Sequence, residues 1–222
     1  LFPNVSLNDF VQTRTKVTNL LDDYALIPLE TSDECLVGGR FCKIIKSEGH
    51  YFIQSMNEIL VFDNSGRYER KLSRMGNGAQ EYNQLLDFDI AEDCGEIWVS
   101  SLSGILRYKL DDFQYISKIP LSFFASKIKY VGNDKFLALT PDDKVFNLCS
   151  VEGKVLDSYY DKDLANSGQR TVQFVKIKEK FISGLADSNT AVCYDPENNL
   201  FSMQNIIPTY NDKVVTTDIN RQ

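Results

Sequence analysis

A unit of four short strands recurs along the chain at a nearly constant interval. Its clearest marker is the residue near the end of each third strand, namely Phe62, Tyr108, Cys149 and Tyr194, so the interval stays between about 41 and 46 residues. Such units bury their apolar faces only by stacking on neighbouring copies. Four strands in roughly forty residues is the length typical of one propeller blade.

Turn signals separate the expected strands within each unit. Asp63-Asn64-Ser65-Gly66 is a strong hairpin signal, because Asn and Gly tolerate positive φ. We therefore predict an all-β protein, a β-propeller of four-stranded antiparallel blades forming one domain over residues 1–222. The alternative is a two-layer β-sandwich, which has short strands but no unit recurring at this interval. The expected blades cover residues 40–73, 84–120, 126–160 and 171–206.

The ends of the chain bear on how such a propeller closes. Residues 24–31 are predicted to form a strand, and Pro28 places it at an edge because proline has no N–H to donate. Closed propellers pair strands from both ends of the chain, so this strand is expected to complete a blade. Three readings stay open: a fifth blade from residues 1–40 and 207–222, a truncated chain, or an open array that closes with a second copy.

Charge and composition narrow the classes of partner. The formal net charge is −7 and the isoelectric point is about 4.8, so the surface repels phosphate backbones and we expect no nucleic acid partner. No apolar run is long enough to span a bilayer. The chain begins with Leu1 rather than methionine, so a preceding segment, including a lipid anchor, is expected to have been removed.

The five cysteines show no Cys-x-x-Cys spacing, and His50 is the one histidine. We expect free and mostly buried thiols, with a Cys35–Cys42 disulfide as the alternative. A histidine-based triad or metal site is not expected, since a second histidine is missing. We assign no catalytic residue, no metal ligand and no cofactor.

Asp87 and Asp89 lie two apart in an alternating stretch, so they share one face of a predicted strand. The first strand of a propeller blade lines the central channel, where carboxylates from several blades can bind calcium. The other reading is a solvated strand face. Calcium is the one cofactor that these residues would suit.

The stretch from Arg74 to Tyr82 joins the first two predicted blades. Arg74, Glu81 and Tyr82 are candidate binding residues there, together with Asp87 and Asp89. The alternative is structural: Glu81 would bond to loop amides, Tyr82 would wedge between blades, and Arg74 would pair with Glu81.

The run Gly76-Asn77-Gly78-Ala79-Gln80-Glu81-Tyr82, with Ile59 to Arg67 before it and Asp87-Phe88 after it, resembles a family of six-bladed NHL-like propellers of gut-dwelling Gram-negative bacteria. The usual motif of that family is Gly-x-Gly-Pro-Gly-Glu-Tyr. Ala79 and Gln80 replace its Pro and Gly here, so they are expected to alter the turn. The resemblance implies an exported protein, often a lipoprotein, in the periplasm or at the outer membrane or cell surface. It also implies six blades, of which about four are recognisable here.

Two functions are compatible with these features. The first is a non-enzymatic binding or scaffold propeller that presents its loops to a protein, peptide or glycan. The alternative is a calcium-dependent propeller hydrolase or lactonase with carboxylates in the channel. The missing histidines and the scattered carboxylates favour the first.

Overall fold

The computed structural model describes residues 25–38, 43–140, 145–159, 171–185 and 190–205. Contacts divide the chain into two compact units, one of residues Ile27–Gly168 and one of Leu1–Leu26 with Gln169–Gln222. Each unit is described by itself below. The predicted fifth unit over 1–40 and 207–222 falls largely outside the described residues.

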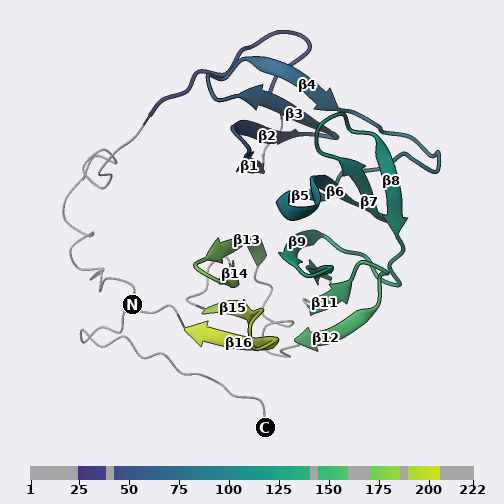
Figure 1. Cartoon of the computed structure of the whole chain (residues 1–222), viewed down its shortest axis with the longest axis vertical. Coiled ribbons are helices and arrows are strands. Elements are labelled where there is room, and N and C mark those ends of the chain that lie inside the picture. Colours follow the sequence, from purple (N-terminus) through teal and green to yellow (C-terminus); the bar gives the residue numbers. More distant parts are fainter. Residues whose placement is uncertain (1–24, 39–42, 141–144, 160–170, 186–189, 206–222) are drawn as a thin grey trace. The chain divides into compact units, whose positions relative to one another are not determined.

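The larger unit contains three antiparallel sheets, each made of four strands that follow one another in the chain (Figure 1). The first blade consists of β1 (Ile44–Ser47), β2 (His50–Ser55), β3 (Glu58–Asp63) and β4 (Tyr68–Leu72). The second consists of β5 (Asp87–Ala91), β6 (Glu96–Ser101), β7 (Gly104–Lys109) and β8 (Tyr115–Ile119), with a 3-10 turn, η3 (Glu92–Cys94), after β5. The third consists of β9 (Lys127–Gly132), β10 (Lys135–Leu139), β11 (Phe146–Ser150) and β12 (Val155–Tyr159).

The smaller unit contains a fourth sheet of the same kind. Its strands also pair in sequence order, and they are β13 (Thr171–Ile177), β14 (Lys180–Leu185), β15 (Thr190–Asp195) and β16 (Leu200–Asn205). The four sheets lie within the four residue ranges expected from the sequence. Because every sheet is built from four consecutive strands, the all-β propeller prediction is confirmed and the sandwich alternative is wrong.

The residues that mark the repeat occupy one structural position. Phe62, Tyr108, Cys149 and Tyr194 are each the last but one residue of the third strand in their blade, and all four are buried. In the first three blades the pairing to the fourth strand shifts register at this residue. The recurrence in the sequence therefore reflects a core contact that all four blades repeat and a bulge that the first three share.

Apolar side chains fill the spaces between successive blades of the larger unit. Phe52 and Val61 of the first blade belong to one buried cluster with Phe88 and Val99 of the second. Trp98 belongs to the next cluster, between the second and third blades, and its ring meets Phe136 edge-on at 5.6 Å. Burial of these faces is what stacks one blade on the next.

The strand predicted over residues 24–31 is not present in its described part, residues 25–31. This segment instead crosses the β3–β4 turn, where the Glu30 N–H donates to the Gly66 carbonyl at 2.8 Å and the Glu30 carboxylate accepts from the Tyr68 N–H at 3.0 Å. Pro28 offers no N–H, which prevents a continuous ladder. The expectation of a regular edge strand here is wrong.

Replacing Gly66 by alanine is expected to cost about 2 kcal/mol of folding free energy. Gly66 has φ of +84°, where alanine is strained, and an added Cβ would collide with the carbonyl of Pro28. Gly95→Ala is the matched control, since Gly95 also has positive φ but open space around its Cβ. Urea unfolding of both variants should show the larger loss for Gly66→Ala, and equal losses would contradict the contact with Pro28.

Candidate binding surface at the crossing end of the blades

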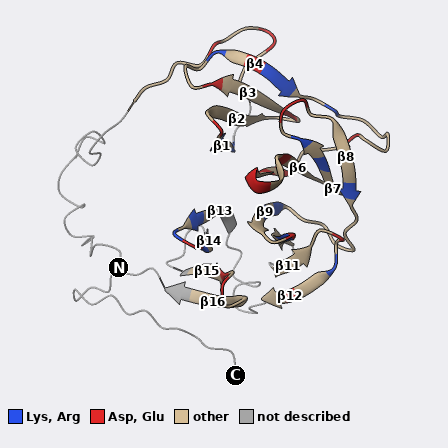
Figure 2. Ribbon diagram, viewed as in Figure 1, with Lys and Arg blue, Asp and Glu red and all other residues tan. Residues whose placement is uncertain are grey.

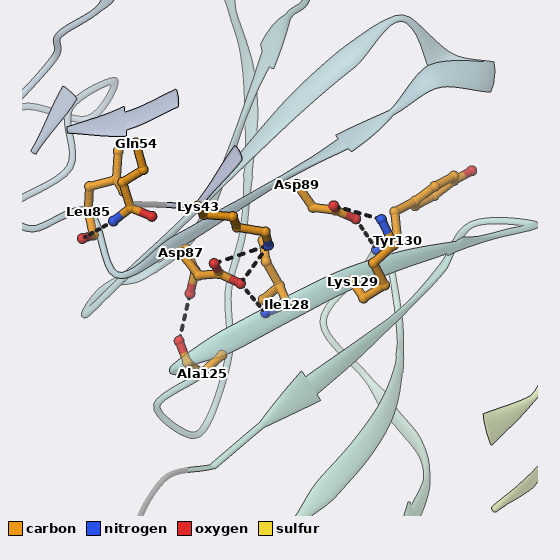
Figure 3. Close-up of polar contacts among 10 residues, drawn as sticks. Lys43, Gln54, Leu85, Asp87, Asp89, Ala125, Ile128, Lys129 and Tyr130 are labelled. Atoms are coloured by element: carbon orange, nitrogen blue, oxygen red, sulfur yellow. Dashed lines mark hydrogen bonds and ion pairs between the residues drawn. The ribbon is translucent and has the colours of Figure 1, made fainter. Parts of the chain in front are cut away.

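The first strands of the three blades in the larger unit, β1, β5 and β9, lie beside one another (Figure 1). Polar groups on them form a buried network (Figure 3). Asp87 is completely buried, and its carboxylate oxygens lie 3.1 Å from the Lys43 ammonium. The same carboxylate accepts from the Ile128 N–H at 2.9 Å. One side chain of the second blade therefore binds the first and the third.

Asp89, two residues further along β5, also accepts from a lysine and a backbone N–H, but both of its partners belong to β9. Its carboxylate accepts from the Lys129 ammonium at 2.8 Å and from the Tyr130 N–H at 2.7 Å. Both aspartates face β9, as the alternation predicted (Figure 3). A charged group removed from water needs such partners, because an unpaired buried charge is costly.

These contacts bear on the predicted calcium site. Calcium ligands are carboxylate and carbonyl oxygens free to turn toward the ion, whereas Asp87 and Asp89 each hold a lysine and a backbone N–H. In the described part of the chain, no three His, Cys, Asp or Glu side chains are grouped as metal ligands would be. The geometry gives the two aspartates a role in joining blades, and calcium binding stays a prediction.

The position of Asp87 recurs in each blade of the larger unit. The equivalence follows from the residue directly after this position, which in every one of these blades pairs with the fourth residue of the second strand. The pairs are Ile44 with Ile53, Phe88 with Val99, and Ile128 with Ala138. Lys43, Asp87 and Lys127 are therefore equivalent. The charge at this position alternates in sign from blade to blade, which lets the central aspartate attract the lysine of the first blade.

The loop from Arg74 to Tyr82 folds back on itself at the junction of the first two blades. The Tyr82 N–H donates to the Arg74 carbonyl at 3.0 Å, and the Gly76 N–H donates to the Tyr82 carbonyl at 3.0 Å. The Glu81 carboxylate accepts from the Gly78 N–H at 2.8 Å and lies against Gly76, where a Cβ would overlap it. Glycine at both positions leaves room for the Glu81 carboxylate to lie against the loop backbone.

Tyr82 is fully buried in the core between the first two blades. Its hydroxyl donates to the Asn57 carbonyl at 2.8 Å and accepts from the Arg74 N–H at 3.2 Å. Burial raises the pKa of this phenol above its ordinary value of 10. Tyr82 and Glu81 thus have the contacts of the structural alternative, while Arg74 forms no ion pair with Glu81 among the described side chains.

The two ends of the blades in the larger unit differ in chemistry. At one end lie the turns after each first and third strand, and every one of them contains or directly follows an acidic residue (Asp and Glu are red in Figure 2): Glu48, Asp63, Glu92 and Asp93, Asp111 and Asp112, Asp134, and Glu152. At the other end lie the turns after each second strand and the loops that cross between blades. We call it the crossing end. Its described hairpin turns are Met56-Asn57 and Leu102-Ser103, which are uncharged.

A pocket of about 330 Å³ opens at the crossing end of the first blade. Three exposed apolar side chains line it, with Leu36 63%, Met56 73% and Met75 62% accessible to solvent. Buried Ser55 fixes its wall, since its hydroxyl accepts from the Gly38 N–H at 2.9 Å. This pocket was not predictable from the sequence, because its residues come from three separate segments. We call Leu36, Met56 and Met75 the apolar rim.

A larger groove of about 690 Å³ lies at the acidic end, between the first and second blades. Its lining includes His50, Arg70 and Lys109, together with exposed carboxylates. The His50 ring and the Arg70 guanidinium both approach one oxygen of Glu69 at 3.2 Å. Much of the charge here is balanced within the groove, so it indicates no ligand of one particular charge.

The thiols of Cys35, Cys94, Cys149 and Cys193 are free, and Cys42 lies outside the described residues. Burial raises the pKa of Cys149 to about 12. The folded chain keeps this proton at pH values where the unfolded thiol, near 9, has lost it. The free energy of unfolding should therefore fall between pH 9 and 12, by up to about 1.4 kcal/mol per pH unit from this thiol. Urea titrations across that range measure the slope, which Cys149→Ala should reduce.

The model of a family described as a domain of unknown function, DUF4934, matches residues 2–221. The chain belongs to this family. No curated protein matches it in sequence. The six blades implied by the NHL-like resemblance stay a prediction, since the described residues form four.

Solved structures share the fold at low sequence identity. U3-55K is 12% identical with a TM-score of 0.55, covering 76% of this chain and 53% of that one. The Pan2 WD40 domain of Neurospora crassa is 10% identical with a TM-score of 0.52, covering 72% and 49%. The chain thus spans about half the length of each. A "putative exported protein" of Bacteroides fragilis is 14% identical with a TM-score of 0.45, covering 82% and 75%.

No helix in the described segments has the length and apolar character needed to cross a membrane.

Proposed function

We propose that this chain is a non-enzymatic binding propeller that docks a protein partner through the apolar rim at the crossing end. The observation that carries the proposal is the convergence of Leu36, Met56 and Met75, all exposed, on one pocket. Scattered apolar side chains are ordinary on a surface, but a group around a concavity is typical of an interaction site. Methionine suits such a site because its flexible thioether adapts to different partners.

The second blade supports the same reading. Leu102 occupies the same turn position as Met56, directly after the last residue of the second strand, and it is also exposed. The contrast with the acidic turns at the opposite end indicates a partner bound by apolar contact rather than by net charge. A protein or peptide fits better than a glycan, since the pocket lining contains no aromatic ring on which a sugar could stack.

A random peptide library displayed on phage tests this function. Clones selected on the wild-type chain should lose at least about tenfold in binding to Met56→Glu/Met75→Glu, because two charges would be forced into an apolar contact. Leu156→Glu is the matched control, an exposed apolar residue on the outer strand β12. Clones that bind the double variant as well as the wild type would contradict the proposal.

We also propose that the protein acts outside the cytoplasm, in the periplasm or at the cell surface, as a lipoprotein. The support is the resemblance of the Gly76 to Tyr82 stretch to exported propellers. Fractionation of cells that express the full-length gene product with a C-terminal tag tests it. Recovery in the cytoplasmic fraction would contradict it.

A further inference from the structure

The charged groups beside the pocket are mostly paired within the chain. Glu58 accepts from the Lys71 ammonium at 3.2 Å and from the Ser73 hydroxyl at 2.7 Å. The Glu81 carboxylate accepts a hydrogen bond from the Gly78 N–H. The carboxylates of Glu58 and Glu81 therefore already have donors within the chain.

Arg74 is the exception. It lies between Ser73 and Met75, two residues that line the pocket, and it is exposed. Its backbone is held by Tyr82, but within the described part of the chain its guanidinium has no hydrogen bond or ion pair. Arg74 does not itself line the pocket, but its backbone is flanked on both sides by residues that do, so an exposed cation with five N–H donors is anchored one residue away from the pocket wall.

We infer that the partner presents an apolar side chain together with a carboxylate one or two residues away. The inference rests on the proposed function and specifies its partner. The pocket of about 330 Å³ lies at the small end of ligand sites, so it has room for one anchor side chain rather than a folded element. The carboxylate would accept from Arg74 in the two-pronged geometry that guanidinium favours. The partner is thus an acidic–apolar peptide segment.

The three methionines provide the readout. With the methyl carbons labelled, Met56 and Met75 report on the pocket, and Met203, in β16, is the reference. The probes are the capped dipeptides acetyl-Leu-Asp-amide, acetyl-Leu-Asn-amide and acetyl-Gly-Asp-amide. We expect the Leu-Asp probe to shift the Met56 and Met75 signals selectively, the Leu-Asn probe to bind about threefold more weakly, and the Gly-Asp probe to have little effect.

The outcomes separate this inference from the proposed function. Arg74→Gln should abolish the preference for Asp over Asn while leaving the Leu-Asn affinity unchanged, and added salt should do the same. Equal binding of the Leu-Asp and Leu-Asn probes to the wild type would overturn the carboxylate but leave the apolar site standing. If neither leucine probe moves the Met56 and Met75 signals, both the inference and the proposed function fail.

Discussion

Asp87→Ala is expected to lower the free energy of unfolding by about 3–5 kcal/mol, a loss in the range measured when one partner of a buried ion pair is removed. The change leaves the Lys43 ammonium and the Ile128 N–H without their acceptor, in a place where Asp87 itself is inaccessible to solvent. Trp98 is the single tryptophan and lies in the core between the second and third blades, so its fluorescence in urea reports the loss.

Two further variants test whether the loss of stability comes from the buried ion pair. Glu92→Ala removes an exposed carboxylate from the same blade and should change stability by no more than about 0.5 kcal/mol. Asp87→Leu combined with Lys43→Met should recover part of the loss, because no charge is then buried alone, although the Ile128 N–H still lacks an acceptor. An Asp87→Ala protein that unfolds at the wild-type urea concentration would show that the network carries no stability.

Tyr82→Ala should cost about 3–5 kcal/mol, as for other large aromatic side chains removed from a core. The ring fills the space between the first two blades, and its hydroxyl connects the crossing loop to Asn57 in the β2–β3 turn. Tyr82→Phe keeps the ring and removes only the hydroxyl, so about 1 kcal/mol is expected. The same urea titration measures both variants.

Comparing the two Tyr82 variants shows whether the ring or the hydroxyl provides the stability. A large loss for alanine and a small one for phenylalanine means that packing between blades dominates, whereas similar losses would mean that the hydroxyl holds the loop. Leu102→Ala serves as the comparison, since this exposed turn residue should be nearly neutral. A neutral Tyr82→Ala would contradict the wedge role altogether.

Much of the architecture was predictable because it depends on local repetition. Phe62, Tyr108, Cys149 and Tyr194 mark the blades because each blade buries this residue, and in the first three blades it also lies beside a bulge. The face shared by Asp87 and Asp89 followed from alternation alone. The strand expected around Pro28 is absent from residues 25–31, where the Glu30 N–H donates to a turn of the first blade rather than to a neighbouring strand.

The candidate binding site could not be predicted from the sequence, because its residues are distant from one another along the chain. Leu36, Met56 and Met75 lie far apart in the sequence, and each looks like an ordinary loop residue until the fold brings them to one pocket. Likewise, the lysines that neutralise the aspartates belong to other blades, so the sequence showed carboxylates without their partners. Arg74 was a candidate from the sequence, and what the structure adds is its isolation beside the pocket.

The alternation of Lys43, Asp87 and Lys127 limits how this protein could gain blades. Repeat proteins lengthen when a whole unit is duplicated within the gene. A copy of the first or third blade placed where the second now stands would set one lysine against another and leave the next first strand without its acceptor. The second blade is therefore not interchangeable with its neighbours, and the order of blades is fixed by charge as well as by chain connectivity.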